Sequence, residues 1–288
     1  MERHRIRWDR RGWSALTGLL LLACCVGSAQ AAGMDAVIGI SPGAMSPQAT
    51  VRSYGARLQE TALGAYVADS MRAGSGTEIA IECGGHLVDS LPGGSLTRAD
   101  AKEVFAEDLQ VAVVEVTAGQ LFDLLEYAVG SAGLDEAERL DEETGSDCFP
   151  QISGFSFEFD VSQLAGRRLR WVMLDDGTVL RREDTRGLTA ALPMDMLDGT
   201  LGFSMLDGMS YRTVGTQSQL LIEYIQGQGT VEILSTGRIS MLGSADQTLY
   251  ETLHVQGFLP YVILLILLFR IPKLVREWRT KERETLEH

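Results

Sequence analysis

Apolar residues recur at helical spacing in several stretches of the middle of the chain. In residues 57–71, leucine, tyrosine, valine and methionine side chains fall on one face of a helix. Thr97 and Thr117 each precede another such stretch, as a threonine that caps a helix does. Asp100 follows Thr97 at the spacing of a capping box. The pattern therefore predicts helices at residues 57–71, 97–105, 119–129 and 217–225.

Other stretches have the patterns of β-strands. Residues 111–116 are a β-branched run of a buried strand, and residues 155–159 alternate Phe-Ser-Phe-Glu-Phe, as a half-buried strand does. Further strands are expected at 78–81, in a hairpin of 168–174 with 177–181 around Asp175-Asp176-Gly177, and in an extended segment over 231–239. Residues 134–147 are acidic and predict a solvated loop or frayed helix. Helices and strands alternate without a strict repeat, which favours an α+β fold, loosely α/β, with a mixed sheet and packed helices.

The start of the chain has the pattern of a secretory signal peptide. Arginines come first, an apolar run from Trp13 to Gly27 follows, and Ala29-Gln30-Ala31 offers small residues for cleavage after Ala31. Two alternatives stay open. The segment could remain as an uncleaved anchor, or Cys24 could become a lipidated N-terminus, because Leu21-Leu22-Ala23-Cys24 loosely fits a lipoprotein box.

The end of the chain has a second apolar run, from Gly257 to Phe269. We expect a transmembrane helix over 253–275, with Arg270 and Lys273 reaching the interface. The alternative is a buried core helix. The basic residues that follow favour a cytoplasmic tail. The predicted organisation is a signal peptide at 1–31, a domain at 34–240, a linker at 241–252, a membrane segment at 253–275 and a tail at 276–288. The domain is then extracytoplasmic and the protein is a single-pass protein of the cell membrane.

Charge and histidine content exclude several classes of function. The chain has a formal net charge of −14, and residues 32–269 hold 14 cations and 33 anions, a net −19. A chain this acidic, with no basic stripe, is not expected to bind nucleic acid. Only His86 and His254 lie in that exported part, too few for most multi-histidine metal centres. We therefore expect no metal, no cofactor and no catalytic residues.

Cys83 and Cys148 are the cysteines that remain after signal cleavage. In an oxidising compartment such a pair can form a disulfide, and the alternative is two buried thiols. The spacing does not decide between them.

The order of the motifs resembles the C-terminal, substrate-binding domain of the 5'-nucleotidase family. The resemblance spans roughly Met34 to Ile239. It includes an opening helix, a strand with a Gly-rich turn, a Pro-Gly turn before the next helix, and a distinctive Phe-Pro motif. The stretches that carry it are Glu60–Asp69, Ile79–Gly85, Leu91–Thr97, Val113–Thr117, Leu121–Glu126 and Phe149–Gly154. The resemblance implies ligand positions at Cys83, Gly84, Gly85, Gly202 and Phe203, and implies that the segments of Cys83 and Cys148 approach one another.

The departures from the family pattern lie at the ligand positions. The family's Asn before the glycines and Arg after them correspond here to Cys83 and Val88, and His86 stands where a third Gly is expected. Neither Cys nor Val offers an anion the paired donors of Arg. The base-stacking Pro-Phe corresponds to Ala106-Glu107, and the family's later Asn-Asp corresponds to Pro193-Met194. Of the family's Gly-Gly-Asp-Gly-aromatic stretch, only Gly202 and Phe203 persist.

Only 28 residues separate Ala31 from Glu60, so we expect this chain to lack the catalytic metallophosphatase domain that the resemblance would place before residue 60. The expected function is a membrane-anchored binding or interaction module that is not an enzyme by itself. The alternative is the substrate-binding component of a nucleotidase whose metallophosphatase is a separate chain, and a purely structural surface module is a third possibility. The expected partners are the membrane and a secreted metallophosphatase or other surface protein.

Overall fold

The computed structural model describes residues 33–48, 54–233 and 237–245. Residues 33–36 belong to a unit separate from the one that starts at Val37; they form a turn in which the Ala36 N–H donates to the Gly33 carbonyl at 2.9 Å. The predicted signal peptide, membrane segment and tail lie outside the described residues. Within the described residues, none of the helices combines the length and the apolar character needed to span a bilayer.

Three sheets form the framework of the unit that starts at Val37. A five-stranded mixed sheet has the order β10-β4-β9-β2-β5, in which β2 and β9 are parallel and the other neighbours antiparallel. A four-stranded sheet has the order β11-β6-β7-β8, and β1 pairs with β3. The strands are β1 Val37–Ser41, β2 Ile79–Cys83, β3 Gly94–Thr97, β4 Gln110–Thr117, β5 Pro150–Ser153, β6 Phe155–Asp160, β7 Leu169–Leu174, β8 Val179–Leu180, β9 Gly187–Pro193, β10 Arg212–Thr216 and β11 Ile239–Leu242.

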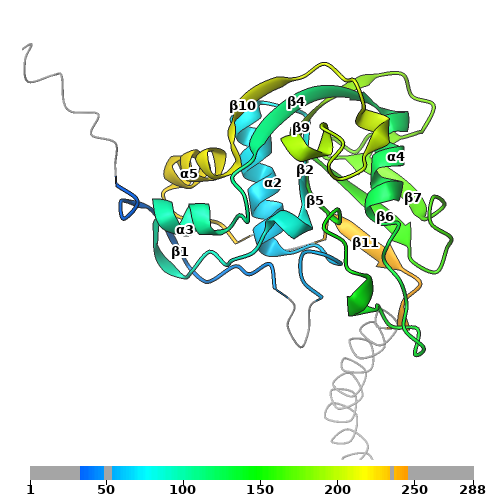
Figure 1. Ribbon diagram of the computed structural model, residues 1–288, viewed down its shortest axis with the longest axis horizontal. Helices are drawn as coiled ribbons and strands as arrows, with labels where there is room; N and C mark the ends of the chain where they lie inside the picture. The colour runs from blue at the N-terminus through cyan, green and yellow to red at the C-terminus, as the bar shows by residue number, and fades with distance from the viewer. Residues whose placement is uncertain (1–32, 49–53, 234–236, 246–288) are drawn as a thin grey trace, which may run out of the picture. The chain divides into compact units, whose positions relative to one another are not determined.

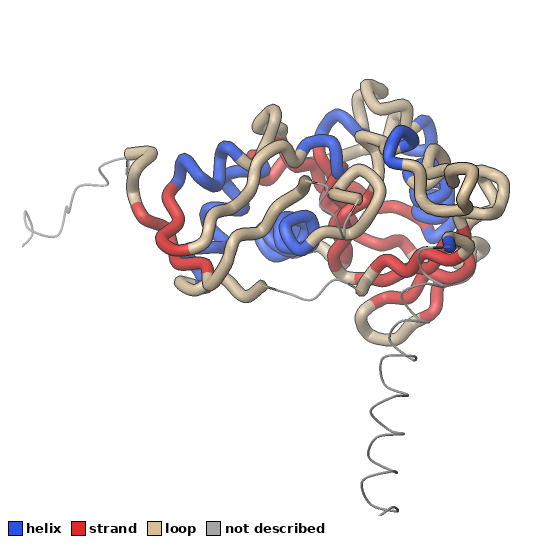
Figure 2. Tube along the Cα trace, turned by 90° about the horizontal axis from the view of Figure 1, so that it is seen from below, coloured by secondary structure: helices blue, strands red, loops and turns tan. Residues whose placement is uncertain are grey.

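Four α-helices and four short 3-10 helices complete the fold of the described residues. Figure 1 shows α2 and α5 on one side of the five-stranded sheet and α4 on the other, near β6 and β7. Figure 2 shows the same helices in blue and strands in red after a turn of 90°. The helices are α2 Ala62–Ser75, α3 Arg98–Glu103, α4 Ala118–Ala128, α5 Gln217–Gln228, η1 Gly84–His86, η2 Glu142–Thr144, η3 Met194–Met196 and η4 Ser204–Leu206.

Two apolar cores lie on the two faces of the five-stranded sheet. Strand β2 contributes Ile79, Ile81 and Cys83 to the core that includes α4 and the four-stranded sheet, and contributes Ala80 to the core that includes α2 and α5. This alternation follows from the period of two in a strand. Glu82 therefore lies on the α2 and α5 side of the sheet, where it is fully buried.

Most of the predicted elements are confirmed. Helices occur in all four predicted ranges, and Thr97 and Thr117 are N-caps with complete capping boxes. The half-buried strand at 155–159 and the hairpin after residue 168 are β6, β7 and β8, and residues 134–147 are mostly loop. The α+β fold with a mixed sheet is confirmed.

Several boundaries are wrong, including the ends of α2 and α5, which extend to Ser75 and Gln228 instead of residues 71 and 225. Helix α2 begins at Ala62 instead of residue 57, because Thr61 is the N-cap and accepts the Gly64 N–H, while Leu58 is buried from a turn. The last strand, β11, begins at Ile239, where the predicted extended segment ends. Strands β1, β3, β5, β9 and β10 were not predicted, since each is short or lacks a run of β-branched residues.

Candidate functional site

Glu82 is the polar centre of the region where β2 ends. Its Oε1 accepts the Cys83 N–H at 2.7 Å, and its Oε2 accepts a hydrogen bond from Gln217 Nε2 at 2.6 Å. Gln217 opens α5, and its Oε1 accepts the Leu109 N–H. A buried carboxylate needs such partners, because an ion that leaves water without compensation is costly. The end of β2 is thereby joined to the start of α5.

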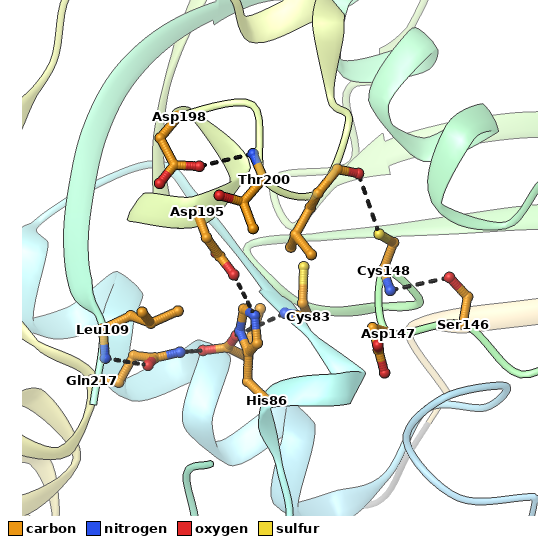
Figure 3. Close-up of polar contacts among 12 residues, drawn as sticks. Cys83, His86, Leu109, Ser146, Asp147, Cys148, Asp195, Asp198, Thr200 and Gln217 are labelled. Carbon is orange, nitrogen blue, oxygen red and sulfur yellow. Dashed lines mark hydrogen bonds and ion pairs between the residues drawn. The ribbon is translucent and has the colours of Figure 1, made fainter. Parts of the chain in front are cut away.

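His86 supplies the positive charge that balances Glu82. Its Nδ1 donates to Glu82 Oε1 at 2.6 Å. Its Nε2 donates to Asp195 Oδ2 at 2.8 Å, as Figure 3 shows. Burial alone would lower the pKa of His86, but the hydrogen bonds to Asp195 and Glu82 outweigh it and raise the pKa to about 10. At neutral pH the ring is a cation with both nitrogens occupied, so it cannot act as a general base.

The paired glycines let two loops close over the end of β2. A Cβ at Gly84 would lie 1.9 Å from the Ala56 carbonyl oxygen, and one at Gly85 would lie 2.4 Å from Asp147 Oδ1. Both N–H groups are used within the chain: Gly84 donates to the Phe149 carbonyl and Gly85 to the Asp147 carbonyl. The glycines therefore serve close packing, and these two N–H groups are already occupied by protein acceptors.

A pocket of about 560 Å³ lies beside the glycine turn, and we call it the glycine-turn pocket. Both glycines line it, together with Gln48, Arg57 and Val88. Arg57 pairs with Asp147 at 2.6 Å, with both side chains more than half exposed. An exposed ion pair of this kind contributes little to stability. The segment of Arg57, which lines the pocket, is held to the segment of Asp147 mainly by main-chain hydrogen bonds, such as that from the Ser146 N–H to the Arg57 carbonyl.

Phe203 is part of the core, whereas Gly202, just before it, is exposed. Phe203 is 1% exposed and meets Tyr127 edge-on, with ring centroids 4.9 Å apart. Gly202 has φ +77°, and a Cβ there would lie 2.6 Å from Tyr127 Oη. Tyr127 Oη donates to the Leu201 carbonyl at 2.8 Å. The Phe203 ring is thus occupied by a protein neighbour.

A second pocket, of about 500 Å³, is named here the Tyr127 pocket. Its lining includes Tyr127, Ser131, Ser146, Cys148 and Arg182. Cys83 and Phe203 line neither this pocket nor the glycine-turn pocket. Cys83 and Cys148 are both free thiols in the structure.

Three segments that correspond to ligand positions of the family meet around His86: the glycine turn, the segment of Ala106 and the segment that follows Pro193-Met194. The Ala106 N–H donates to the His86 carbonyl at 2.9 Å, and Asp195 follows the Pro193-Met194 pair. Val88, which corresponds to the family's Arg, does not take part in this group, and its side chain is 44% exposed. Sequence reasoning missed Glu82, Asp195 and Gln217. The signal for Glu82 was present, because a carboxylate inside the apolar strand Ile79–Cys83 requires a buried partner.

No group of three or more His, Cys, Asp or Glu side chains suited to a metal ion occurs within 33–48, 54–233 and 237–245. The Glu82–His86–Asp195 group is held together by hydrogen bonds, and a protonated imidazole is not a metal ligand.

The family model of the 5'-nucleotidase C-terminal domain matches residues 37–206. The chain belongs to this family. The resemblance in the order of the motifs is thereby confirmed. The trifunctional nucleotide phosphoesterase protein YfkN of Bacillus subtilis (strain 168) is 26% identical over 137 residues, which cover 45% of this chain and 9% of that protein.

Solved structures share the fold at lower identity. The 5'-nucleotidase precursor of Thermus thermophilus superposes with a TM-score of 0.63 at 23% identity, over 81% of this chain and 44% of that one. A putative 5'-nucleotidase from Staphylococcus aureus has a TM-score of 0.60 at 14% identity, over 84% of this chain and 46% of that one. The chain thus spans less than half the length of these relatives.

Proposed function

We propose that this protein is a membrane-anchored, extracytoplasmic domain of the 5'-nucleotidase C-terminal family that serves as a binding or interaction module and does not hydrolyse nucleotides by itself. The observation that supports the proposal best is the Glu82–His86–Asp195 group. It lies where segments that correspond to ligand positions of the family meet, and both ring nitrogens of His86 are hydrogen-bonded within the chain.

Charge adds to this argument. His86 carries one positive charge between two carboxylates, so the group is net negative and repels the phosphate of a nucleotide. An Arg–phosphate contact and a stacked ring each contribute on the order of 1–3 kcal/mol to nucleotide binding. Loss of both weakens binding roughly a hundredfold or more.

Calorimetry with the full chain tests the proposal. We expect AMP and adenosine to bind no more tightly than about millimolar. Adenosine is the fairer probe of stacking, because it lacks the phosphate that the acidic surface repels. Micromolar AMP binding that Phe203→Ala weakens would contradict the proposal. A metal-dependent release of phosphate from AMP that copurifies with the chain would contradict it as well.

The second candidate is the substrate-binding component of a nucleotidase or phosphoesterase. It is favoured by the coverage of the relatives: their names include 5'-nucleotidase and nucleotide phosphoesterase, and this chain corresponds to less than half of each. A separate metallophosphatase chain would then supply catalysis. Mixing the full chain with such a secreted phosphatase distinguishes the two candidates, because only a substrate-binding component changes the KM for nucleotide.

A further inference from the structure

Cys83 and Cys148 lie next to one another where β2 and β5 separate. In the β2–β5 ladder Cys83 is opposite Pro150. Beyond the ladder, the Gly84 N–H donates to the Phe149 carbonyl at 2.8 Å and the Gly85 N–H donates to the Asp147 carbonyl at 3.0 Å. Cys148 lies between these two acceptors and its carbonyl accepts neither bond, as for the extra residue of a β-bulge. A bulge redirects a side chain. Figure 3 shows that the side chains of Cys83 and Cys148 leave the two backbone segments on the same side and that their sulfur atoms are directed toward the same region.

The two thiols differ in access. Cys83 is fully buried in the core, whereas Cys148 is half-buried and lines the Tyr127 pocket. A reagent in that pocket therefore meets Cys148 first, and Cys83 lies behind it. Cys148 Sγ donates weakly to the Leu201 carbonyl at 3.7 Å, but Tyr127 Oη donates to the same carbonyl at 2.8 Å. Loss of the S–H proton from Cys148 therefore leaves no orphaned acceptor.

We propose that the Tyr127 pocket is an oxidation site. At this site Cys148 first forms a mixed disulfide with a small disulfide or a thiol–disulfide oxidoreductase. Cys83 then displaces the oxidant and forms the Cys83–Cys148 disulfide. In the first step the Cys148 thiolate attacks one sulfur of the oxidant and releases one thiol of it. In the second step the Cys83 thiolate attacks Cys148 Sγ and releases the other. The two cysteines lose two protons and two electrons, and the oxidant becomes two thiols.

The surroundings make this reaction slow in the absence of a catalyst. Burial raises the pKa of both thiols, and nearby carboxylates, among them Asp147 and Asp195, raise them further. The thiolate, which is the reacting form, is therefore scarce at neutral pH. We expect the rate with a small disulfide to rise about tenfold per pH unit between pH 7 and 8.5.

The cross-link would join the glycine turn to the loop that ends at Phe149. It would close a loop of 66 residues counting both ends. A loop of that size restricts the unfolded chain, so the apparent Tm should rise by on the order of 10 °C. The Arg57–Asp147 wall of the glycine-turn pocket would then be tied covalently to β2.

The test uses the full chain with Cys24→Ser and Cys25→Ser, reduced and then exposed to oxidised glutathione. We expect the denatured protein to lose both thiols, its mass to fall by about 2 Da, and a cleaved peptide pair to contain Cys83 joined to Cys148. Cys148→Ser and Cys148→Ala are the matched variants: neither should show the rise in Tm on oxidation. A glutathione adduct that persists on Cys148 with Cys83 still free, or two thiols that stay free at pH 8.5, would overturn the proposal.

Oxidation of the two cysteines in cells rests on the proposed extracytoplasmic location of the domain. The experiment with purified protein does not depend on that location. If the purified chain oxidises but the protein isolated from cells is fully reduced, the oxidation site stands and the proposed location fails. If the purified chain does not oxidise, the oxidation site fails and the proposed function is unaffected.

Discussion

The burial of Glu82 is tolerated because His86 lies against it as a cation. Removing one partner of a buried ion pair costs about 3–5 kcal/mol, since the other charge is left uncompensated. We expect His86→Gln to lower the free energy of unfolding by about 3 kcal/mol at pH 6, as measured by urea denaturation. The control is Asp123→Asn, which breaks the exposed Arg182–Asp123 pair and should cost less than about 1 kcal/mol.

The same pair predicts a pH dependence. The folded pKa of His86 is raised to about 10 from 6.5 in the unfolded chain. The stabilisation by His86 is therefore complete below pH 6.5 and is lost as the pH rises from 6.5 to about 10. The difference in unfolding free energy between the wild type and His86→Gln should shrink over that window. A difference that is the same at pH 6 and pH 9.5 would show that His86 is not charged in the folded protein.

Gly84 is required by packing, and a substitution shows it without any ligand. Gly84→Ala places a Cβ 1.9 Å from the backbone oxygen of Ala56, so the loop must shift, and we expect a loss of about 1–3 kcal/mol in the free energy of unfolding. Gly227 is a helical glycine in α5 with open space around it. Gly227→Ala should therefore stabilise by roughly 0.5–1 kcal/mol. Equal effects of the two substitutions would contradict the packing argument.

The elements with a strong local signal could be predicted from the sequence. Helix α4 combines the Thr117 cap, Gln120 three residues later and an apolar face, and its predicted boundaries differ from the observed ones by about one residue. Strand β9 could not be found in this way, because it is defined by pairing with both β4 and β2, far away in sequence. Its residues carry no β-branched run, so its strand character comes from tertiary context.

The same limit applies to the candidate site. Cys83 and the glycines could be located, because a strand followed by Gly-Gly is a local pattern. Asp195 could not, because the contact that makes it important spans 109 residues. Gln217 lies 135 residues from Glu82, its partner. Contacts between residues this far apart in the chain depend on the folded topology, so no local sequence pattern indicates them.

The carboxylate of Glu60 binds the backbone at the start of strand β11. Glu60 Oε2 accepts the N–H groups of Gly237, Arg238 and Ile239 at 2.7–3.1 Å, and Arg238 Nη1 lies 2.9 Å from Asp69 Oδ1. Glu60→Ala removes an acceptor shared by three consecutive donors. We expect trypsin to cleave after Arg238 at least tenfold faster in this variant, because proteolysis of a locally opened segment follows the free energy of opening.

Glu223→Gln is the control for this experiment, since Glu223 is exposed on α5. Its rate of cleavage after Arg238 should equal that of the wild type. If Glu60→Ala is cleaved no faster than Glu223→Gln, the pairing of β11 with β6 and the Arg238–Asp69 ion pair hold the segment, and the Glu60 carboxylate is dispensable.

At the scale of the whole molecule, the predicted topology depends on the two ends of the sequence. The apolar run before Ala31 and the basic residues from Arg270 onwards predict that the domain is exported and the tail stays in the cytoplasm. The net charge of −19 on residues 32–269 fits a domain held off an anionic lipid surface. Protease added to intact cells should therefore remove the domain and spare a tag placed after His288. As a control, the same protease should reach the tag once the cells are permeabilised. A domain that stays intact in whole cells while a known surface protein is cleaved would contradict the predicted topology.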